Sequence, residues 1–133
     1  MDERDRLNDG MTMRRAVHGD AYVEESLEKR TAFNGEFLDL LTRYAWGEIW
    51  TRPGLDRCTR SLLCLAMMVA LNREEELRLH VRSSLNNGVT REQIKEVLLQ
   101  TAVYCGIPAA NSAFRLAAEV FAEVVEQPTS HGG

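Results

Sequence analysis

The residues best suited to acid–base chemistry are a glutamate and a histidine four positions apart, Glu76 and His80. Residues at this spacing are neighbours on one side of an α-helix, where the carboxylate would orient the imidazole and favour its protonated form. Such a pair can donate or accept a proton near neutral pH. The same spacing also fits an ordinary contact at the edge of the core, and spacing alone leaves both interpretations open.

Other polar side chains could bind or position an acidic ligand. The chain has 14 arginines and 2 lysines, a ratio that fits either a GC-rich genome or the binding of carboxylates by planar guanidinium groups. Arg60 lies in the first turn of a predicted helix, where the helix dipole disfavours a cation, so it either binds an anion or extends off the core. Trp46, Glu48 and Trp50 cluster at the end of another predicted helix. The tryptophans either pack in the core or form the wall of a pocket. Asn111 could cap a helix or contact a ligand.

Several functional classes are excluded by what the sequence lacks. It contains no glycine-rich phosphate loop, no G-x-S-x-G elbow, no H-E-x-x-H motif and no calcium-binding loop. Its three cysteines form no CxxC pair, and with only three histidines a structural zinc site is not expected. The net charge of -4 and the absence of a basic patch argue against nucleic acid as a partner.

The sequence also predicts where the chain resides. Its longest apolar run, residues 62–71, is shorter than the roughly 20 residues of a membrane span. Residues 1–15 alternate acids and arginines and do not resemble a secretory signal. An odd number of cysteines without such a signal indicates reduced thiols and a cytoplasmic location.

The elements that must position these side chains are helices. Proline occurs only at positions 53, 108 and 128, and apolar residues recur with helical spacing over long stretches, which predicts an all-α, single-domain bundle. Residues 1–19 are expected to form a polar arm or a loosely docked turn, residues 20–126 the helical domain, and residues 127–133 a disordered tail. About six helices are predicted, over residues 20–30, 33–50, 56–71, 74–86, 91–105 and 109–126.

Local signals fix several of the predicted boundaries. Asp56 is a candidate N-cap, residues 90–93 read as a capping box, and Gly88 suits the left-handed position after a helix. The helix over residues 56–71 is apolar nearly all round, and the last helix has a face rich in alanine. These faces are too apolar for a monomer, so the chain is expected to assemble as an oligomer.

The ordered motifs of the chain resemble the carboxymuconolactone decarboxylase family over about residues 10–124. The resemblance rests on the segments Met13–Val17, Arg43–Trp50, Arg52–Asp56, Arg60–Leu63, Glu74–His80, Gly88–Ile94 and Gly106–Asn111. It implies an all-α, alkylhydroperoxidase-D-like fold that assembles as homo-oligomers, commonly trimers or hexamers. Redox members of that superfamily carry a CxxCxxxH motif. His80 matches its histidine, but Arg73 and Glu76 occupy the two cysteine positions, which excludes dithiol chemistry.

The reaction implied by the resemblance is the conversion of 4-carboxymuconolactone to 3-oxoadipate enol-lactone in protocatechuate catabolism, the β-ketoadipate pathway. The substrate is a lactone dicarboxylate whose ring accepts the electrons left by CO2, so no cofactor and no metal are expected. The enzyme must bind two carboxylates, stabilise an oxyanion and deliver a proton.

The resemblance also implies roles for the candidate residues. His80 would be the acid or the donor to the lactone oxygen, with Glu76 orienting it and Glu48 as the alternative acid. Arg60 and Arg78 would bind the carboxylates, and Trp46 and Trp50 would form the wall of the pocket. Asn111 would be a further contact to the substrate. Two alternatives remain: a decarboxylase or isomerase of a related lactone acid, and a non-catalytic oligomeric binding protein.

Overall fold

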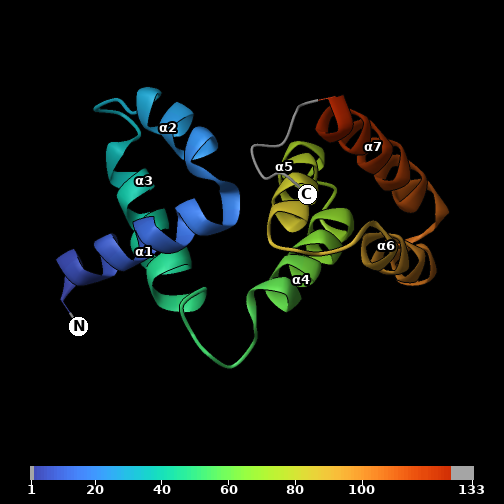
Figure 1. Ribbon diagram of the computed structural model, residues 1–133, viewed down its shortest axis with the longest axis horizontal. Coiled ribbons are helices and arrows are strands. Elements are labelled where there is room, and N and C mark those ends of the chain that lie inside the picture. Colours follow the sequence, from blue (N-terminus) through green and yellow to red (C-terminus); the bar gives the residue numbers. More distant parts are fainter. Residues whose placement is uncertain (1, 127–133) are drawn as a thin grey trace. The chain divides into compact units, whose positions relative to one another are not determined.

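A computed structural model describes residues 2–126 of the chain, and in these residues all regular structure is helical (Figure 1). The all-α prediction is therefore confirmed. The helices group into two compact units that divide between Arg60 and Ser61, a division that the sequence analysis did not predict. The predicted tail, residues 127–133, lies outside the described residues.

The chain begins with a helix, α1 (Glu3–His18), where the sequence analysis expected a polar arm. Asp2 caps this helix, since its carboxylate accepts a hydrogen bond of 2.8 Å from the backbone N–H of Asp5. The polar composition concealed a narrow inward stripe with helical spacing, formed by Gly10, Arg14 and Val17. One of these three buried residues is an arginine and one a glycine, so apolar periodicity alone could not identify the helix.

The predicted helix over residues 33–50 consists of two parts. An α-helical part, α3 (Gly35–Leu41), continues into a π-helix, η1 (Thr42–Ile49), in which hydrogen bonds span five residues instead of four. The backbone N–H of Trp50 closes the π-helix on the carbonyl of Ala45 at 3.0 Å. π-Helical turns often occur at functional sites, and this one contains Trp46 and ends next to Trp50, the two tryptophans of the chain.

Helix α1 packs against η1 at unusually close range. A Cβ atom on Gly10 would collide with the carbonyl oxygen of Thr42, and one on Gly47 with the carbonyl oxygen of Arg6. The two glycines therefore face each other at a backbone-to-backbone crossing that no side chain could enter. This crossing holds η1 in place and is the main contact within the first unit.

The rest of the first unit is held by short local contacts. Helix α2 (Asp20–Glu28) ends two residues before the predicted boundary and buries Val23. The Arg30 guanidinium then binds both carboxylate oxygens of Asp39, at 2.7 and 3.0 Å. This bidentate pair connects the loop after α2 to α3 and lowers the pKa of Asp39.

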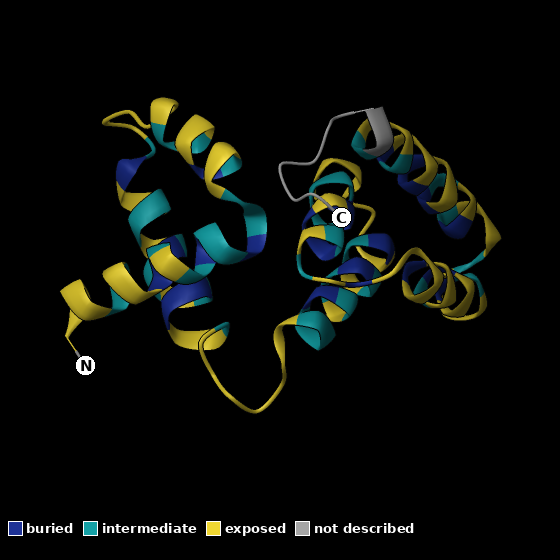
Figure 2. Cartoon of the chain, in the orientation of Figure 1, coloured by how far each residue is buried: buried dark blue, intermediate teal, exposed yellow. Residues whose placement is uncertain are grey.

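The second unit contains helices whose boundaries the sequence predicted well. They are α4 (Arg57–Ala70), which begins before the division between the units, α5 (Glu74–Asn86), α6 (Arg91–Cys105) and α7 (Ile107–Glu126). Asp56 accepts a hydrogen bond from the backbone N–H of Thr59 at 2.7 Å, Thr90 and Gln93 form the predicted capping box, and Gly88 has a φ of 87°. Buried apolar side chains on the inner faces of these helices form the core (Figure 2): Leu65, Val69, Leu77, Val81, Ile94, Leu98, Ala113, Ala117 and Val120.

Large apolar side chains also remain exposed, as the sequence analysis expected for an oligomer. Leu63 and Met67 of α4 and Leu71, directly after α4, follow one another at intervals of four residues and are each about half exposed. At the junction of α6 and α7, Val103 and Tyr104 are more than three-quarters exposed. Among the described residues, no helix is long and apolar enough to cross a membrane.

Candidate functional site

The Glu76–His80 pair lies on α5, as predicted, with the imidazole half-buried and the carboxylate exposed. Burial lowers the pKa of His80 below its usual value of 6.5, and Glu76 opposes this shift without overcoming it. The sequence analysis expected the carboxylate to favour the protonated ring. In the structure desolvation is the larger effect, so the free protein holds a neutral imidazole at neutral pH.

The lowered pKa of His80 predicts how the stability of the protein depends on pH. Because the unfolded chain binds a proton at His80 more readily than the folded chain does, the contribution of His80 is fully present above about pH 6.5 and is lost as the pH falls through its folded-state pKa. We expect His80→Gln to lose less unfolding free energy than the wild type between pH 7 and pH 5, measured by urea titration at each pH. Parallel curves for the two proteins would contradict the assigned burial.

A buried polar cluster lies on α5 beyond the pair and was missed by the sequence analysis. Ser84, one turn after His80, is fully buried, and its hydroxyl is sealed from solvent without a hydrogen-bond partner. In the following turn Asn87 donates a hydrogen bond of 3.3 Å to the hydroxyl of Ser61 on α4. Unsatisfied buried hydroxyls are uncommon, and this one lies one turn away from the best candidate for acid–base chemistry.

Arg78 is engaged in ion pairs on the surface of the second unit. Its guanidinium lies 2.6 Å from a carboxylate oxygen of Glu119 and 3.7 Å from one of Glu123, both on α7. Arg82 continues the network to Glu123 at 2.7 Å. To bind a substrate carboxylate Arg78 would have to release these acids, which favours a role in joining α5 to α7.

Arg60 has a different environment, since no carboxylate of residues 2–126 forms an ion pair with it. One terminal nitrogen donates to the backbone carbonyl of Arg52 at 3.1 Å, whereas its Nε is sealed from solvent without a partner. A buried guanidinium N–H that finds no acceptor in the protein is a free-energy cost that an anionic ligand could offset. Of the two predicted carboxylate-binding arginines, Arg60 is therefore the better candidate.

Trp46 of η1 and Trp50, the residue directly after η1, stack on each other and form part of an aromatic cluster. The ring centroids of Trp46 and Trp50 are 4.8 Å apart, and the ring of His18 packs edge-on against Trp46 at 4.9 Å. His18 also meets Tyr22 of α2. Glu48, between the two tryptophans in the sequence, is exposed, so the cluster does not hold its carboxylate in a dry environment.

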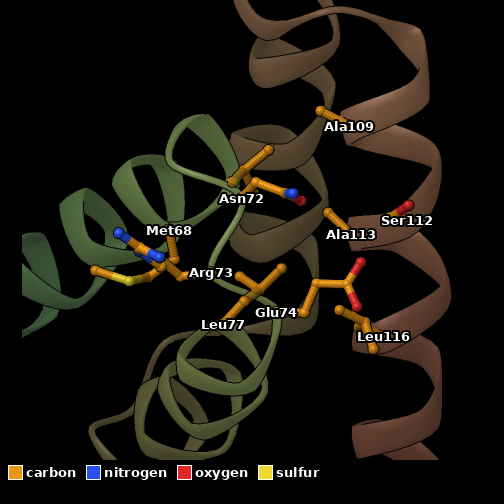
Figure 3. A pocket seen from close by; sticks show the side chains of 10 residues that line it. Met68, Asn72, Arg73, Glu74, Leu77, Ala109, Ser112, Ala113 and Leu116 are labelled. Carbon is orange, nitrogen blue, oxygen red and sulfur yellow. The ribbon is translucent and has the colours of Figure 1, made fainter.

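The remaining predicted residue, Asn111, is exposed in the first turn of α7. A hollow lies nearby, between the end of α4, the start of α5 and α7 (Figure 3). It has a volume of about 10 Å³, room for about one water molecule, and is lined by residues such as Asn72, Glu74 and Ser112. None of the predicted site residues lines it, and a hollow of about 10 Å³ is too small for an organic acid.

The first unit also contains a buried polar residue, Arg14, that was not predicted to belong to a site. Arg14 is only 4% exposed and is the one charged side chain among the buried described residues. Its only recorded partner is the hydroxyl of Ser26, at 2.9 Å. Its position in the Met13–Val17 segment was the only signal in the sequence that could have identified it.

The cysteines of the described residues form no disulfide with one another. Cys58, Cys64 and Cys105 are unbridged, and burial raises the pKa of the Cys64 thiol, as expected for a core residue. No group of three potential ligands that could hold a metal ion is found among residues 2–126.

Comparisons with known proteins identify close relatives. The family model of the carboxymuconolactone decarboxylase family matches residues 35–119. The chain is 45% identical over 124 residues to a 4-carboxymuconolactone decarboxylase of Acinetobacter baylyi, which covers 93% of this chain and 92% of that protein. It is 40% identical over 121 residues to the nitrosuccinic acid decarboxylase npaB of Metarhizium robertsii, which covers 91% and 85%. A 4-carboxymuconolactone decarboxylase sequence of Pseudomonas putida is 54% identical over 48 residues, 36% of this chain and 100% of that sequence.

Proposed function

Because the chain belongs to the carboxymuconolactone decarboxylase family, we propose that it converts 4-carboxymuconolactone to 3-oxoadipate enol-lactone with release of CO2. The observation that carries this proposal is the 45% identity to the Acinetobacter baylyi enzyme across 93% of the chain. The reaction would place the protein in protocatechuate catabolism, within the β-ketoadipate pathway. The substrate class is a small lactone bearing two carboxylates.

The chemistry requires little from the protein beyond binding and proton handling. When the carboxylate on the quaternary ring carbon leaves as CO2, its bonding electrons pass through the ring double bond into the lactone carbonyl and form a dienolate. A proton added to the carbon next to that carbonyl then gives the enol-lactone. Since the substrate supplies its own electron acceptor, the proposal needs no cofactor.

His80 is the residue proposed to handle the proton. Its imidazole is neutral in the free protein, so its ring N–H can donate a hydrogen bond to the lactone oxygen. The negative charge that develops there raises the proton affinity of the ring, which then takes up a solvent proton and passes it to carbon. Glu76, one turn earlier on α5, is proposed to orient the ring.

The carboxylates and the lactone ring require a cationic partner and an apolar wall. Arg60, whose Nε lacks an acceptor in the protein, is proposed to bind one carboxylate. The stacked pair of Trp46 and Trp50 is proposed to exclude water, which favours CO2 loss because a carboxylate is less stable out of water. Three other predicted residues are less favoured as contacts to the substrate. Glu48 and Asn111 are exposed, and Arg78 is ion-paired with Glu119.

A second candidate reaction follows from the similarity to the nitrosuccinic acid decarboxylase. Nitrosuccinic acid is also a dicarboxylic acid with a built-in electron acceptor, the nitro group. Purified protein should be tested with both acids, with CO2 release and substrate loss followed together. We expect kcat/KM to be higher for 4-carboxymuconolactone by about tenfold or more, and a preference for nitrosuccinic acid would overturn the assigned substrate.

The chain is proposed to assemble as a homo-oligomer, a trimer or a hexamer. Support comes from the exposed stripe of Leu63, Met67 and Leu71 on α4 and from the exposed apolar residues at the α6–α7 junction. We expect sedimentation velocity to give a mass of three or six chains, and Met67→Glu to shift the protein to smaller species. A monomeric wild type at micromolar concentration would contradict the assembly.

A cytoplasmic location is proposed as well. The three cysteines support it because they form no disulfide, and reduced cysteines persist in a reducing compartment. Cell fractionation with an epitope-tagged chain tests it, and recovery in an extracellular or periplasmic fraction would refute it.

A further inference from the structure

Arg14 stands apart from the other arginines of the chain because of its partners. Most of the other arginines lie on the surface, and many pair with acids there: Arg15 with Asp20 and Glu24, for example, and Arg30 with Asp39. Arg14 lies at a core position of α1, 4% exposed, and contacts a neutral serine hydroxyl instead of a carboxylate. The most deeply buried cation among the described residues thus has no recorded carboxylate partner.

Such an arrangement is costly for a protein that has no ligand. A guanidinium stays protonated and has five N–H donors, of which Ser26 accepts one. Burying a charge without a counter-ion is one of the few ways in which a single residue strongly destabilises a fold. No other nitrogen of Arg14 is sealed from solvent without a partner.

The surroundings of Arg14 indicate what kind of anion would fit. His18 follows Arg14 by one helical turn, and its ring packs against Trp46, which stacks on Trp50. An aromatic cluster that begins one helical turn after a planar, fork-shaped cation suits a small organic acid, whose carboxylate can bind both arms of the fork while its apolar body contacts the rings.

We propose that Arg14 binds a carboxylate of the substrate, namely the carboxylate that the product retains. The assignment to a particular carboxylate rests on the proposed decarboxylase function. An arginine paired with the departing carboxylate would stabilise the ground state and slow the loss of CO2. An arginine paired with the retained carboxylate binds substrate and transition state alike. Arg14 therefore acts as a positioning residue, and its loss should change KM far more than kcat.

The test compares Arg14→Met with Arg15→Met, a matched control at the next position of α1 whose arginine is ion-paired and partly exposed. Methionine keeps much of the apolar stem and removes the charge. We expect Arg14→Met to melt at the same temperature as the wild type or higher, because a costly buried charge is gone, while KM rises about 10- to 100-fold and kcat changes much less. Arg15→Met should leave KM unchanged.

Binding measured without turnover separates this inference from the proposed function. The probes are the ring-saturated analogue of 4-carboxymuconolactone, which cannot release CO2, and the same analogue with its retained carboxylate methylated. By calorimetry the wild type should prefer the free acid, and Arg14→Met should bind both equally. A preference that persists in Arg14→Met, or a marked fall in its melting temperature with normal KM, would show that Arg14 is structural and overturn the inference.

If the wild type binds neither analogue, the proposed substrate is wrong and Arg14 is tested with simpler acids. Succinate, glutarate and adipate are then compared for the rise in melting temperature that each causes. We expect at least one of them to stabilise the wild type and Arg15→Met but not Arg14→Met. No stabilisation that depends on Arg14 would overturn the assignment of a carboxylate site.

Discussion

His80→Ala is expected to lower kcat by about 100- to 10,000-fold, the usual contribution of a positioned proton donor or acceptor. The imidazole is half-buried on α5, its pKa is lowered by burial, and Glu76 lies one turn away. These features fit a ring that is neutral at rest and becomes protonated as charge develops beside it. Steady-state kinetics on 4-carboxymuconolactone, with circular dichroism to verify folding, measure the effect.

Two further variants make this result specific to the imidazole. Arg82→Ala changes an exposed residue of the same helix and should retain wild-type kcat, because Arg82 contacts only Glu123 on the surface. Glu76→Gln should have a smaller effect than His80→Ala, since it leaves the ring in place and removes only the charge that orients it. Near-normal turnover by a folded His80→Ala protein would remove His80 from the reaction.

Gly10→Ala is expected to have the largest effect on stability. The added methyl group would collide with the carbonyl oxygen of Thr42 and lie 2.9 Å from the backbone nitrogen of Gly47. Both obstacles are backbone atoms, so relief requires α1 and η1 to move apart. We expect a loss of about 3 kcal/mol or more in unfolding free energy, above the usual cost of overpacking.

The fluorescence of the chain reports this loss directly, because both tryptophans lie in or next to η1. Urea titration followed by tryptophan emission would therefore measure the unit that contains the crossing. Gly54→Ala is the control: nothing lies within 4 Å of its added methyl group, and we expect a change within about 0.5 kcal/mol. Equal stability of the two variants would show that α1 and η1 are not packed backbone to backbone.

The second unit was predictable because its helices carry strong local signals. Thr90 with Gln93, Asp56 and Gly88 mark helix ends by their own hydrogen bonds or backbone conformation, so the sequence reveals them without tertiary information. The inward faces of α5 and α6 likewise follow a regular apolar period. In this part of the chain, local preference and tertiary packing agree.

The first unit was harder to predict because its helices depend on contacts distant in sequence. Helix α1 buries a glycine and an arginine. Gly10 allows the backbone of η1 to approach closely, and Arg14 occupies a core position. Neither residue type contributes to an apolar pattern in the sequence. The π-helix that shifts Trp46 and Trp50 has no recognised sequence signature either. The spacing of Glu76 and His80 identified the pair, but the sequence did not reveal that burial would outweigh the carboxylate at His80.

The measurement that tests the central claim most directly is CO2 release from 4-carboxymuconolactone generated in situ. Purified protein should be assayed after treatment with EDTA and after alkylation of its thiols. We predict one CO2 for each lactone consumed, with 3-oxoadipate enol-lactone as the product and undiminished turnover under both treatments. Folded wild-type protein that releases no CO2 from this lactone would contradict the proposed function.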